Sequence, residues 1–208
     1  MLQTSAIEPG TLALLKRLMN VPELQGASLV GGTALALKFG HRKSIDLDLF
    51  VNENFKQKEI EMALEREFGS EFVYEPTKIT FAVFCMIQSI KVDIVNHPHP
   101  ILKPIELMEG ISFYDNADIS AMKINAILGR GNKKDFFDLA ELLKHYSLGQ
   151  IMEWHKKKYP NQMILISIPN AITYFEDAEQ SENPLSLNGE TWESVKNSIK
   201  KAVRDYLA

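Results

Sequence analysis

The segment that most restricts the fold of this chain is a glycine pair placed between a short apolar run and a helical pattern. Gly31 and Gly32 follow the apolar residues 27–30, which predict a strand, and precede residues 33–39, which predict a helix. A glycine pair at the start of a helix leaves backbone N–H groups and the positive end of the helix dipole open to an anion. The segment therefore predicts a strand, a tight turn and a helix, with a phosphate-sized anion at the turn.

Two aspartates separated by one residue follow this helix. Asp46 and Asp48 lie in the apolar run 46–51, which predicts a second strand. Side chains alternate along a strand, so both carboxylates are expected on one side. The apolar side chains expected on the other side are Ile45, Leu47 and Leu49. Adjacent carboxylates repel unless a cation lies between them, and Mg²⁺ on nucleotide phosphates is the usual one. The pattern favours nucleotidyl or phosphoryl transfer over an acidic pair that merely faces water.

Composition narrows the function classes further. The chain has 208 residues, 45% of them apolar, and a formal net charge of −4, which argues against a uniformly basic nucleic-acid binder. No run approaches the length of a membrane span, no signal pattern is evident, and the single Cys85 is expected to be buried. The cytoplasm is the expected compartment. The lysine-rich segments, interpreted as solvated helix faces, are Lys133-Lys134, residues 156–158, and Lys200-Lys201 with Arg204.

The order of patterns indicates an α/β protein whose second half is helical. Residues 11–19 and 56–68 predict helices, and residues 72–75, 79–87 and 90–95 predict closely spaced strands that we expect to be antiparallel neighbours. The later expected helices are 117–128, 133–146, 148–159, 163–176 and 191–207. We place the boundary between an α/β core (1–110) and a helical subdomain (111–208) near residue 110, with the two halves able to share one core.

Two strings of residues carry a resemblance to a known family. These are GGTALALKFGHRKSIDLDLF at 31–50 and DISAMKINAILGRGNKKDFFDLAELL at 118–143. They resemble the AbiEii branch of the DNA polymerase beta-like nucleotidyltransferases, best known as toxins of bacterial type IV toxin–antitoxin and phage-defence systems. The resemblance spans roughly residues 29–146. It implies a mixed sheet of polymerase beta-like type with flanking helices, followed by a helical C-terminal subdomain that completes the nucleotide site.

The resemblance also implies roles for individual residues. Asp46 and Asp48 would hold the catalytic Mg²⁺, as a single ion or in a two-metal site, while Lys123 and Asp135 would line the nucleotide site. The residues expected to cradle the phosphates of a nucleoside triphosphate (NTP) are Gly31, Gly32 and Thr33, with Arg42 and Ser44 nearby. This chain departs from many superfamily members in having Gly-Gly in place of Gly-Ser, which removes one hydroxyl that could contact a phosphate.

Asp93 is the candidate for a third carboxylate. It lies in the apolar run 90–95, where a buried carboxylate is costly without a partner. If this strand neighbours residues 46–51, Asp93 would join the metal site, and in the superfamily such an acid can polarise the attacking hydroxyl as a general base. The alternative is a structural salt bridge, for example to Lys91 or Arg42.

Lys123 is the most informative residue of the helical half. Its helical neighbours are apolar, and Arg130 lies seven residues later on the same face. Two cations on an apolar face suit a triphosphate, although a lysine can also cover apolar surface with its stem. Asp135 lies at the edge of the next apolar stripe, as a partner for Lys123 or as a first-turn acid of its helix, whereas Asp138 is interpreted as structural.

These patterns lead to one main functional hypothesis and two alternatives. The main one is a Mg²⁺-dependent nucleotidyltransferase that moves NMP from an NTP to an acceptor hydroxyl of RNA, such as a tRNA 3′ end, or of a protein. The family resemblance adds toxicity and a cognate antitoxin as partner, with no membrane involved. The alternatives are a non-catalytic nucleotide-binding regulatory module and a nucleotidyltransferase that modifies an antibiotic. The pair His97 and His99 lacks a third ligand at metal spacing, so no zinc site is expected.

Overall fold

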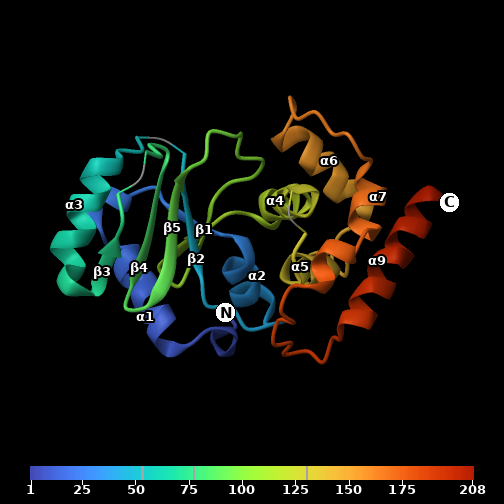
Figure 1. The fold of residues 1–208 in the computed structure, drawn as a ribbon, viewed down its shortest axis with the longest axis horizontal. Coiled ribbons are helices and arrows are strands. Elements are labelled where there is room, and N and C mark those ends of the chain that lie inside the picture. Colours follow the sequence, from blue (N-terminus) through green and yellow to red (C-terminus); the bar gives the residue numbers. More distant parts are fainter. Residues whose placement is uncertain (53, 77, 130) are drawn as a thin grey trace.

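The chain folds into a mixed sheet and a helical half that lie side by side (Figure 1). A computed structural model describes residues 1–52, 54–76, 78–129 and 131–208. Within these residues the strands form one seven-stranded sheet in the order β3-β4-β5-β2-β1-β7-β6. The strands are β1 (Ser28–Val30), β2 (Leu47–Val51), β3 (Phe72–Tyr74), β4 (Ala82–Ile87), β5 (Ile90–Asn96), β6 (Glu106–Met108) and β7 (Ile111–Phe113).

The helices divide between the two halves of the molecule. Helix α3 packs on β3 and β4 at one end of the sheet, α2 packs on β1 and β2, and α4 lies against α5, α6 and α7 in the helical half. The helices are α1 (Pro9–Leu18), α2 (Gly31–Phe39), α3 (Gln57–Phe68), α4 (Asn116–Gly129), α5 (Lys133–Leu142), α6 (Leu148–Lys158), α7 (Ile168–Thr173), α8 (Glu176–Glu179) and α9 (Trp192–Leu207). No helix of the described residues is long and apolar enough to cross a membrane.

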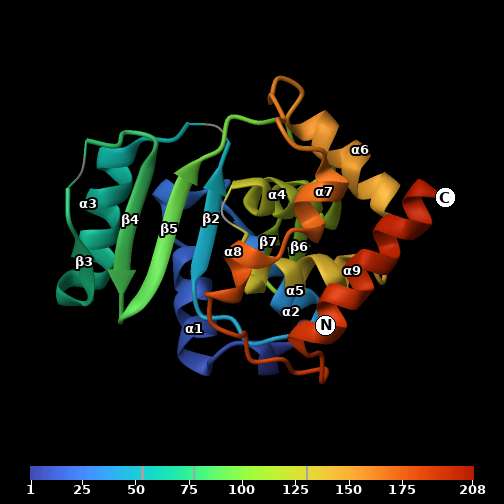
Figure 2. The ribbon, with the colours of Figure 1, turned by 45° about the vertical axis from the view of Figure 1, so that its right-hand side comes forward.

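The centre of the sheet brings the two sequence patterns together. Strand β2 runs antiparallel to β1 and parallel to β5, so it lies between the strand that enters the glycine turn and the strand that carries Asp93. β2 also lies nearer the helical half than β5 and β4 do (Figure 2). The expected antiparallel pairing of β3, β4 and β5 is confirmed. Leu47 and Leu49 are buried and Asp48 lies on the opposite side, as the alternation predicts.

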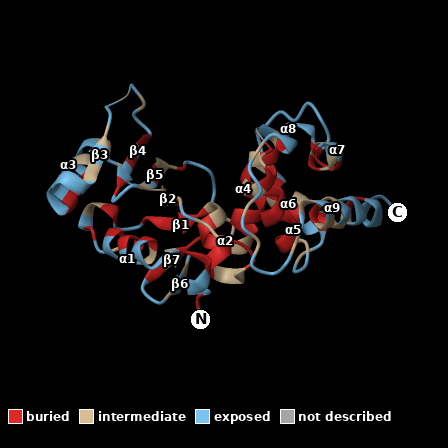
Figure 3. Ribbon diagram, turned by 60° about the horizontal axis from the view of Figure 1, so that its bottom comes forward, coloured by how far each residue is buried: buried red, intermediate tan, exposed pale blue. Residues whose placement is uncertain are grey.

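One hydrophobic core runs through both halves of the molecule. Buried residues from β1, β2 and α2 form a single cluster with those of α4, α5 and α9, and buried segments concentrate where α2 meets α4 and α5 (Figure 3). Helix α2 thus links the sheet to the helical half. Since apolar burial dominates the free energy of folding, this shared core holds the two halves together.

Three expectations about local structure were wrong. Ile45 is 64% exposed because β2 begins only at Leu47. No strand was expected between residues 95 and 117, but this segment contains the hairpin β6–β7, and β7 pairs with β1. The expected helix 163–176 is reduced to α7 (Ile168–Thr173), which has Pro169 in its first turn, and the apolar residues 163–166 before it are exposed. The proposed boundary near residue 110 falls within the hairpin.

Candidate active site

The glycine turn places its backbone directly against the second aspartate. Gly31 begins α2 with φ 70°, a left-handed conformation that favours glycine. Val30 is paired with Asp48 across β1 and β2. A Cβ atom at Gly31 would lie 2.7 Å from Oδ2 of Asp48. Gly31 is therefore required twice, once for the shape of the turn and once for the space that the carboxylate occupies.

Asp48 and Asp93 lie side by side on neighbouring strands. Their Cα atoms are register partners in the parallel pair β2 and β5, which confirms the neighbourhood that the sequence required. Burial and the nearby Asp93 carboxylate raise the pKa of Asp48, although Lys123 and Lys91 act in the opposite direction. Asp93 forms an ion pair with Lys91, whose Nζ atom lies 2.8 Å from Asp93 Oδ2. Its other oxygen, Oδ1, is buried and has no hydrogen-bond partner in the described part of the chain.

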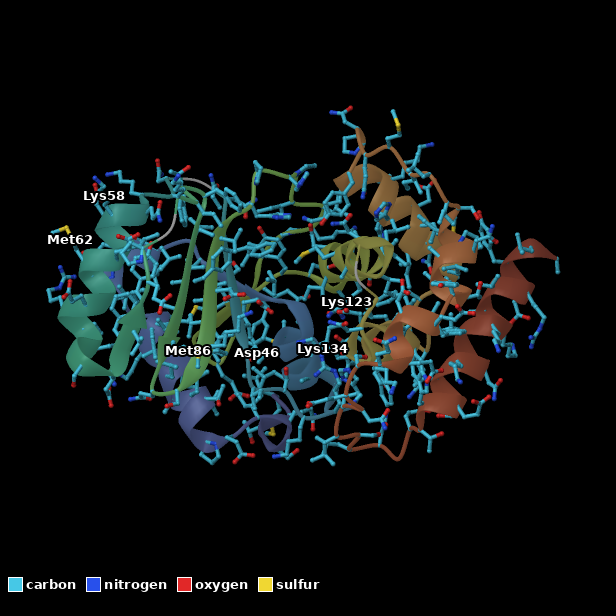
Figure 4. The ribbon with its side chains drawn as sticks, in the orientation of Figure 1. Asp46, Lys58, Met62, Met86, Lys123 and Lys134 are labelled. Atoms are coloured by element: carbon cyan, nitrogen blue, oxygen red, sulfur yellow. The ribbon has the colours of Figure 1, made fainter. Side chains whose placement is uncertain are left out.

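Asp46 occupies the residue immediately before β2 and is only half-buried. Lys134, near the start of α5, approaches its carboxylate to 3.4 Å, and the two side chains meet between the halves of the molecule (Figure 4). The sequence analysis treated Lys134 as part of a solvated face and missed this contact. The Asp46 backbone carbonyl accepts a hydrogen bond from the Thr33 hydroxyl, so α2 fixes the position of the acidic segment.

The carboxylates can be tested for their fit to a divalent cation. Among the residues that the structure describes, no three His, Cys, Asp or Glu side chains are arranged as a ready metal cluster. The pair Asp48 and Asp93 nevertheless has two properties that suit cation ligands: the pKa of Asp48 is raised, and Asp93 has a buried oxygen without a donor among the described residues. Hard oxygen ligands of this kind suit Mg²⁺. Asp48 and Asp93, with Asp46 beside them, therefore fit a cation chemically.

Lys123 lies on the other side of the cleft and is held by two acids of α5. Its Nζ atom is 3.0 Å from Asp135 Oδ1 and 2.7 Å from Asp138 Oδ2. Burial alone would lower the pKa of Lys123, but the two carboxylates outweigh it and raise that pKa. The expected contact between Lys123 and Asp135 is present. The ammonium is therefore a fixed positive charge in the wall of the cleft (Figure 4).

Arg42 lies behind the glycine turn and does not face the cleft with a free guanidinium. Its Nε and Nη2 atoms donate to the two oxygens of Asp138 at 2.7 and 2.9 Å, and His41 Nε2 lies 2.7 Å from the same carboxylate. A Cβ atom on Gly32 would lie 2.1 Å from Nη2 of Arg42. The absence of a side chain at Gly32 thus gives the Arg42 guanidinium room to pack against the turn. To contact a phosphate, Arg42 would have to give up its hydrogen bonds to Asp138.

The two hydroxyl groups of the motif face each other. Thr33 Oγ1 and Ser44 Oγ are 2.8 Å apart, and Thr33 is buried. These side chains join the first turn of α2 to the loop before β2. Among the described residues, no side chain caps the first turn of α2, so no capping side chain occupies the amides that were expected to contact a phosphate. Arg130, expected on the face of Lys123, lies outside the described residues.

A cavity of about 360 Å³ collects much of this chemistry. It is lined by four of the residues singled out by sequence, Gly31, Asp48, Lys123 and Asp135. Asp46, Arg42 and Ser44 line a neighbouring cavity of about 450 Å³ together with Lys134. The expected site residues that line a cavity are therefore divided between two cavities, whereas Gly32, Thr33 and Asp93 are not among the lining residues of either.

The first cavity also has an aromatic wall that sequence reasoning missed. It consists of Phe50, His97, His99 and Tyr159. Phe50 follows Asp48 by two residues on β2, so the alternation of a strand could have placed it on the same side. The two histidines lie in a proline-containing loop, where no periodic pattern indicates the direction of a side chain.

A family model and a relative of known sequence each match most of the chain. The family model described as "Nucleotidyl transferase AbiEii toxin, Type IV TA system" matches residues 13–159. An uncharacterized protein of Aquifex aeolicus (strain VF5) is 34% identical over 185 residues, which cover 86% of this chain and 87% of the relative.

Two solved structures share the fold at low sequence identity. A putative nucleotidyltransferase from H. pylori superposes with a TM-score of 0.57 at 18% identity, covering 95% of this chain and 94% of that one. The nucleotidyltransferase toxin MenT4 from Mycobacterium tuberculosis H37Rv gives a TM-score of 0.57 at 13% identity, covering 93% and 84%. With the family match over residues 13–159, the chain belongs to the AbiEii family of nucleotidyltransferase toxins of type IV toxin–antitoxin systems.

Proposed function

We propose that this protein is a Mg²⁺-dependent nucleotidyltransferase that moves NMP from an NTP to an acceptor hydroxyl. The observation that carries the proposal is the placement of Asp48 beside Asp93 and against the glycine turn, in a cavity whose opposite wall holds Lys123. Paired carboxylates, open helix amides and a fixed ammonium are the complementary parts of a site for a triphosphate.

The phosphates would be held between the glycine turn and the lysine. The backbone N–H groups of Gly32 and Thr33, at the start of α2, lie where the helix dipole favours an anion. Lys123 stays charged because Asp135 and Asp138 raise its pKa. Both groups are fixed before the substrate arrives, so little reorganisation accompanies the development of negative charge on the departing pyrophosphate.

The carboxylates would hold the cation. Asp48 and Asp93 are the proposed ligands, with Asp46 completing the set after it separates from Lys134. When bound, Mg²⁺ supplies charge neutralisation at the phosphate oxygens and Lewis-acid activation of the reacting phosphate. Asp46 is the most exposed of the three, and its ion pair with Lys134 is a surface interaction that costs little to break.

In the proposed transfer step, the acceptor hydroxyl replaces pyrophosphate on the α-phosphorus, and a carboxylate of the chain takes up the hydroxyl proton. The acceptor oxygen forms a bond to the α-phosphorus while the bond from that phosphorus to the bridging oxygen breaks, and pyrophosphate leaves with the electron pair. Asp93 Oδ1, which is buried and without a donor among the described residues, is the proposed acceptor of the hydroxyl proton. Lys91, ion-paired to Oδ2, keeps Asp93 oriented.

The acceptor proposed first is RNA, including a tRNA 3′ end, and a protein hydroxyl is compatible with the same carboxylates. Modification of either would slow growth, in keeping with a family of toxins, and a cognate antitoxin is the proposed partner. We also propose that the protein acts in the cytoplasm, as the sequence patterns favour, and in phage defence, as the family resemblance implies.

The experiment is label transfer from each α-³²P-labelled NTP into total RNA and total protein. We expect Mg²⁺-dependent labelling by the wild type and none by Asp48→Ala, while Asp205→Asn, an exposed acid on α9, serves as the matched control. Labelled RNA or labelled protein identifies the acceptor class. Binding of NTPs without any labelling over both acceptor pools would contradict the proposal and favour a non-catalytic nucleotide-binding module.

A further inference from the structure

The cavity that holds Asp48 and Lys123 has two chemically different ends. One end carries the glycine turn, the carboxylate and the ammonium, whereas the other is the aromatic wall of Phe50, His97, His99 and Tyr159. Phe50 lies on the same side of β2 as Asp48, and His97 follows the end of β5. A ligand that fills the cavity would therefore have an anionic end and a planar, weakly polar end.

His97 is a residue of this wall with a buried nitrogen that has no hydrogen-bond partner in the described part of the chain. It stacks on Phe50 with ring centroids 4.3 Å apart and is 8% exposed. Its Nε2 atom is buried and has no partner in the described part of the chain. A buried polar atom left unpaired costs free energy, so such an atom calls for an explanation. A ligand that fills the cavity lies against this ring and can supply the partner.

The charge state of His97 suits recognition of a neutral group. Burial, followed by the repulsion of Lys158 and His99, lowers the pKa of His97 to about 3. The ring is therefore neutral at physiological pH and offers one donor and one acceptor nitrogen. Across the cavity, Asn125 receives a hydrogen bond from Gln162 on its oxygen at 2.7 Å, which leaves its amide nitrogen as a donor.

The wall is held rigidly, as a recognition surface requires. Lys158, expected on a solvated face, is fully buried and pairs with Asp118 at 2.7 Å. Asp118 also accepts from the backbone N–H of Leu102 at 3.0 Å, and Lys158 donates to the Pro100 carbonyl at 3.0 Å. This buried pair anchors the loop that carries both histidines to α4 and α6. Groups fixed before binding lose little entropy when a ligand arrives.

We infer that the aromatic wall is the nucleobase subsite and that His97, with Asn125, determines which base is accepted. The inference rests on the proposed function, since it assigns the two ends of the cavity to the two ends of an NTP. Planar bases stack on aromatic rings without regard to sequence, so stacking alone gives affinity and not selection. Selection needs hydrogen-bonding groups, because a site whose polar atoms are left unpaired rejects the wrong ligand.

The experiment compares five ligands with the wild type and three variants. Calorimetry with ATP, GTP, CTP, UTP and inorganic tripolyphosphate, each with Mg²⁺, measures the affinity for the base separately from that for the phosphates. His97→Phe keeps a stacking ring without its nitrogens, Asn125→Ala removes the amide, and His145→Phe is the matched control because His145 stacks on Phe39 outside the cavity.

We expect the wild type to bind one NTP or one class of base at least about tenfold more tightly than the others, the scale of a good hydrogen bond. His97→Phe should bring the four dissociation constants together while leaving that of tripolyphosphate unchanged, and His145→Phe should change neither. Asn125→Ala should reduce the same preference, which provides the readout if His97→Phe does not fold.

Different failures separate this inference from the proposed function. If the wild type binds neither NTPs nor tripolyphosphate, the proposed function is contradicted. Equal affinity for all five ligands, or an equal weakening of all four NTPs in both variants, would overturn the assignment of the base subsite and leave the phosphate end intact.

Discussion

The two sides of the cleft carry charge in opposite ways. On the sheet side, Asp48 and Asp93 face each other with one cation, Lys91, paired to one of them. On the helical side, the carboxylate of Asp138 is contacted by Arg42, His41 and Lys123. Lys123 also pairs with Asp135. Compensated charges hold a structure together, whereas uncompensated ones leave room for a ligand.

This difference separates support from reactivity. The contacts of Asp138 join the loop before β2, helix α4 and helix α5, so one carboxylate ties the sheet half to the helical half. The Asp48–Asp93 pair joins nothing that the neighbouring strands do not already join. The repulsion between the two carboxylates is a cost to the fold, as is common at functional sites.

The largest effect on stability should follow removal of the compensated carboxylate. Asp138→Ala leaves the cations of Arg42 and Lys123 buried without this acid, and breaking a buried pair in this way costs about 3–5 kcal/mol. Chemical denaturation measures the loss, with Asp205→Asn as the exposed control. A loss below about 1 kcal/mol would mean that the network does not hold the halves together.

The same variant has a defined pH dependence. Burial opposes ionisation of Asp138, but Arg42 and Lys123 lower its pKa well below the ordinary 3.8. A depressed carboxyl pKa stabilises the fold above 3.8, and this contribution is lost as the pH falls through the folded-state value. The stability difference between the wild type and Asp138→Ala should therefore be full near neutral pH and shrink below about pH 4.

Gly31→Ala should lower the free energy of unfolding less than Asp138→Ala does, and its main effect should be a loss of label-transfer activity. An alanine at φ 70° costs about 1–2 kcal/mol, and its Cβ would lie 2.7 Å from Asp48 Oδ2. Gly10→Ala is the matched control, because α1 has open space there and alanine should stabilise the helix by about 0.5–1 kcal/mol. Unfolding and label transfer are measured on both variants. Full activity of Gly31→Ala would show that Asp48 need not lie against the turn.

Neutralising the carboxylate of Asp48 should stabilise the fold, whereas removing that of Asp138 should destabilise it. Burial and Asp93 raise the pKa of Asp48, so its ionisation destabilises the fold increasingly as the pH rises from 3.8 through the folded-state pKa. Asp48→Asn should therefore raise the melting temperature at neutral pH in EDTA, while label transfer falls by at least about a hundredfold, the scale of losing a strong electrostatic stabiliser. A lower melting temperature would show that Asp48 supports the fold.

The smallest effect is expected at the exposed ion pair. Lys134 and Asp46 are both more than a third exposed and 3.4 Å apart. Lys134→Ala should change the free energy of unfolding by no more than about 0.5 kcal/mol. Denaturation in low and high salt is the measurement. A loss comparable to that of Asp138→Ala would place Lys134 in the compensated network.

The sequence predicted what strand and helix periods determine. Alternation placed Asp48 opposite Leu47 and Leu49, and the apolar run around Asp93 indicated a strand that could lie next to it. Helical spacing placed Lys123 and Asp135 relative to the apolar stripes of their own helices, and the pairing expected between them is present. What it could not give was the direction of side chains in loops. Arg42 turned inward to Asp138, and His97 joined a wall built by a proline-containing loop, because tertiary packing alone sets both.

The central claim is that Asp48 and Asp93 form the cation-dependent half of a nucleotide site. Calorimetry of NTP binding, with Mg²⁺ and with EDTA, to the wild type and to the double variant Asp48→Asn/Asp93→Asn tests it most directly. We expect Mg²⁺ to strengthen NTP binding to the wild type and to have no effect on the double variant. An equal gain from Mg²⁺ in both proteins would contradict the claim.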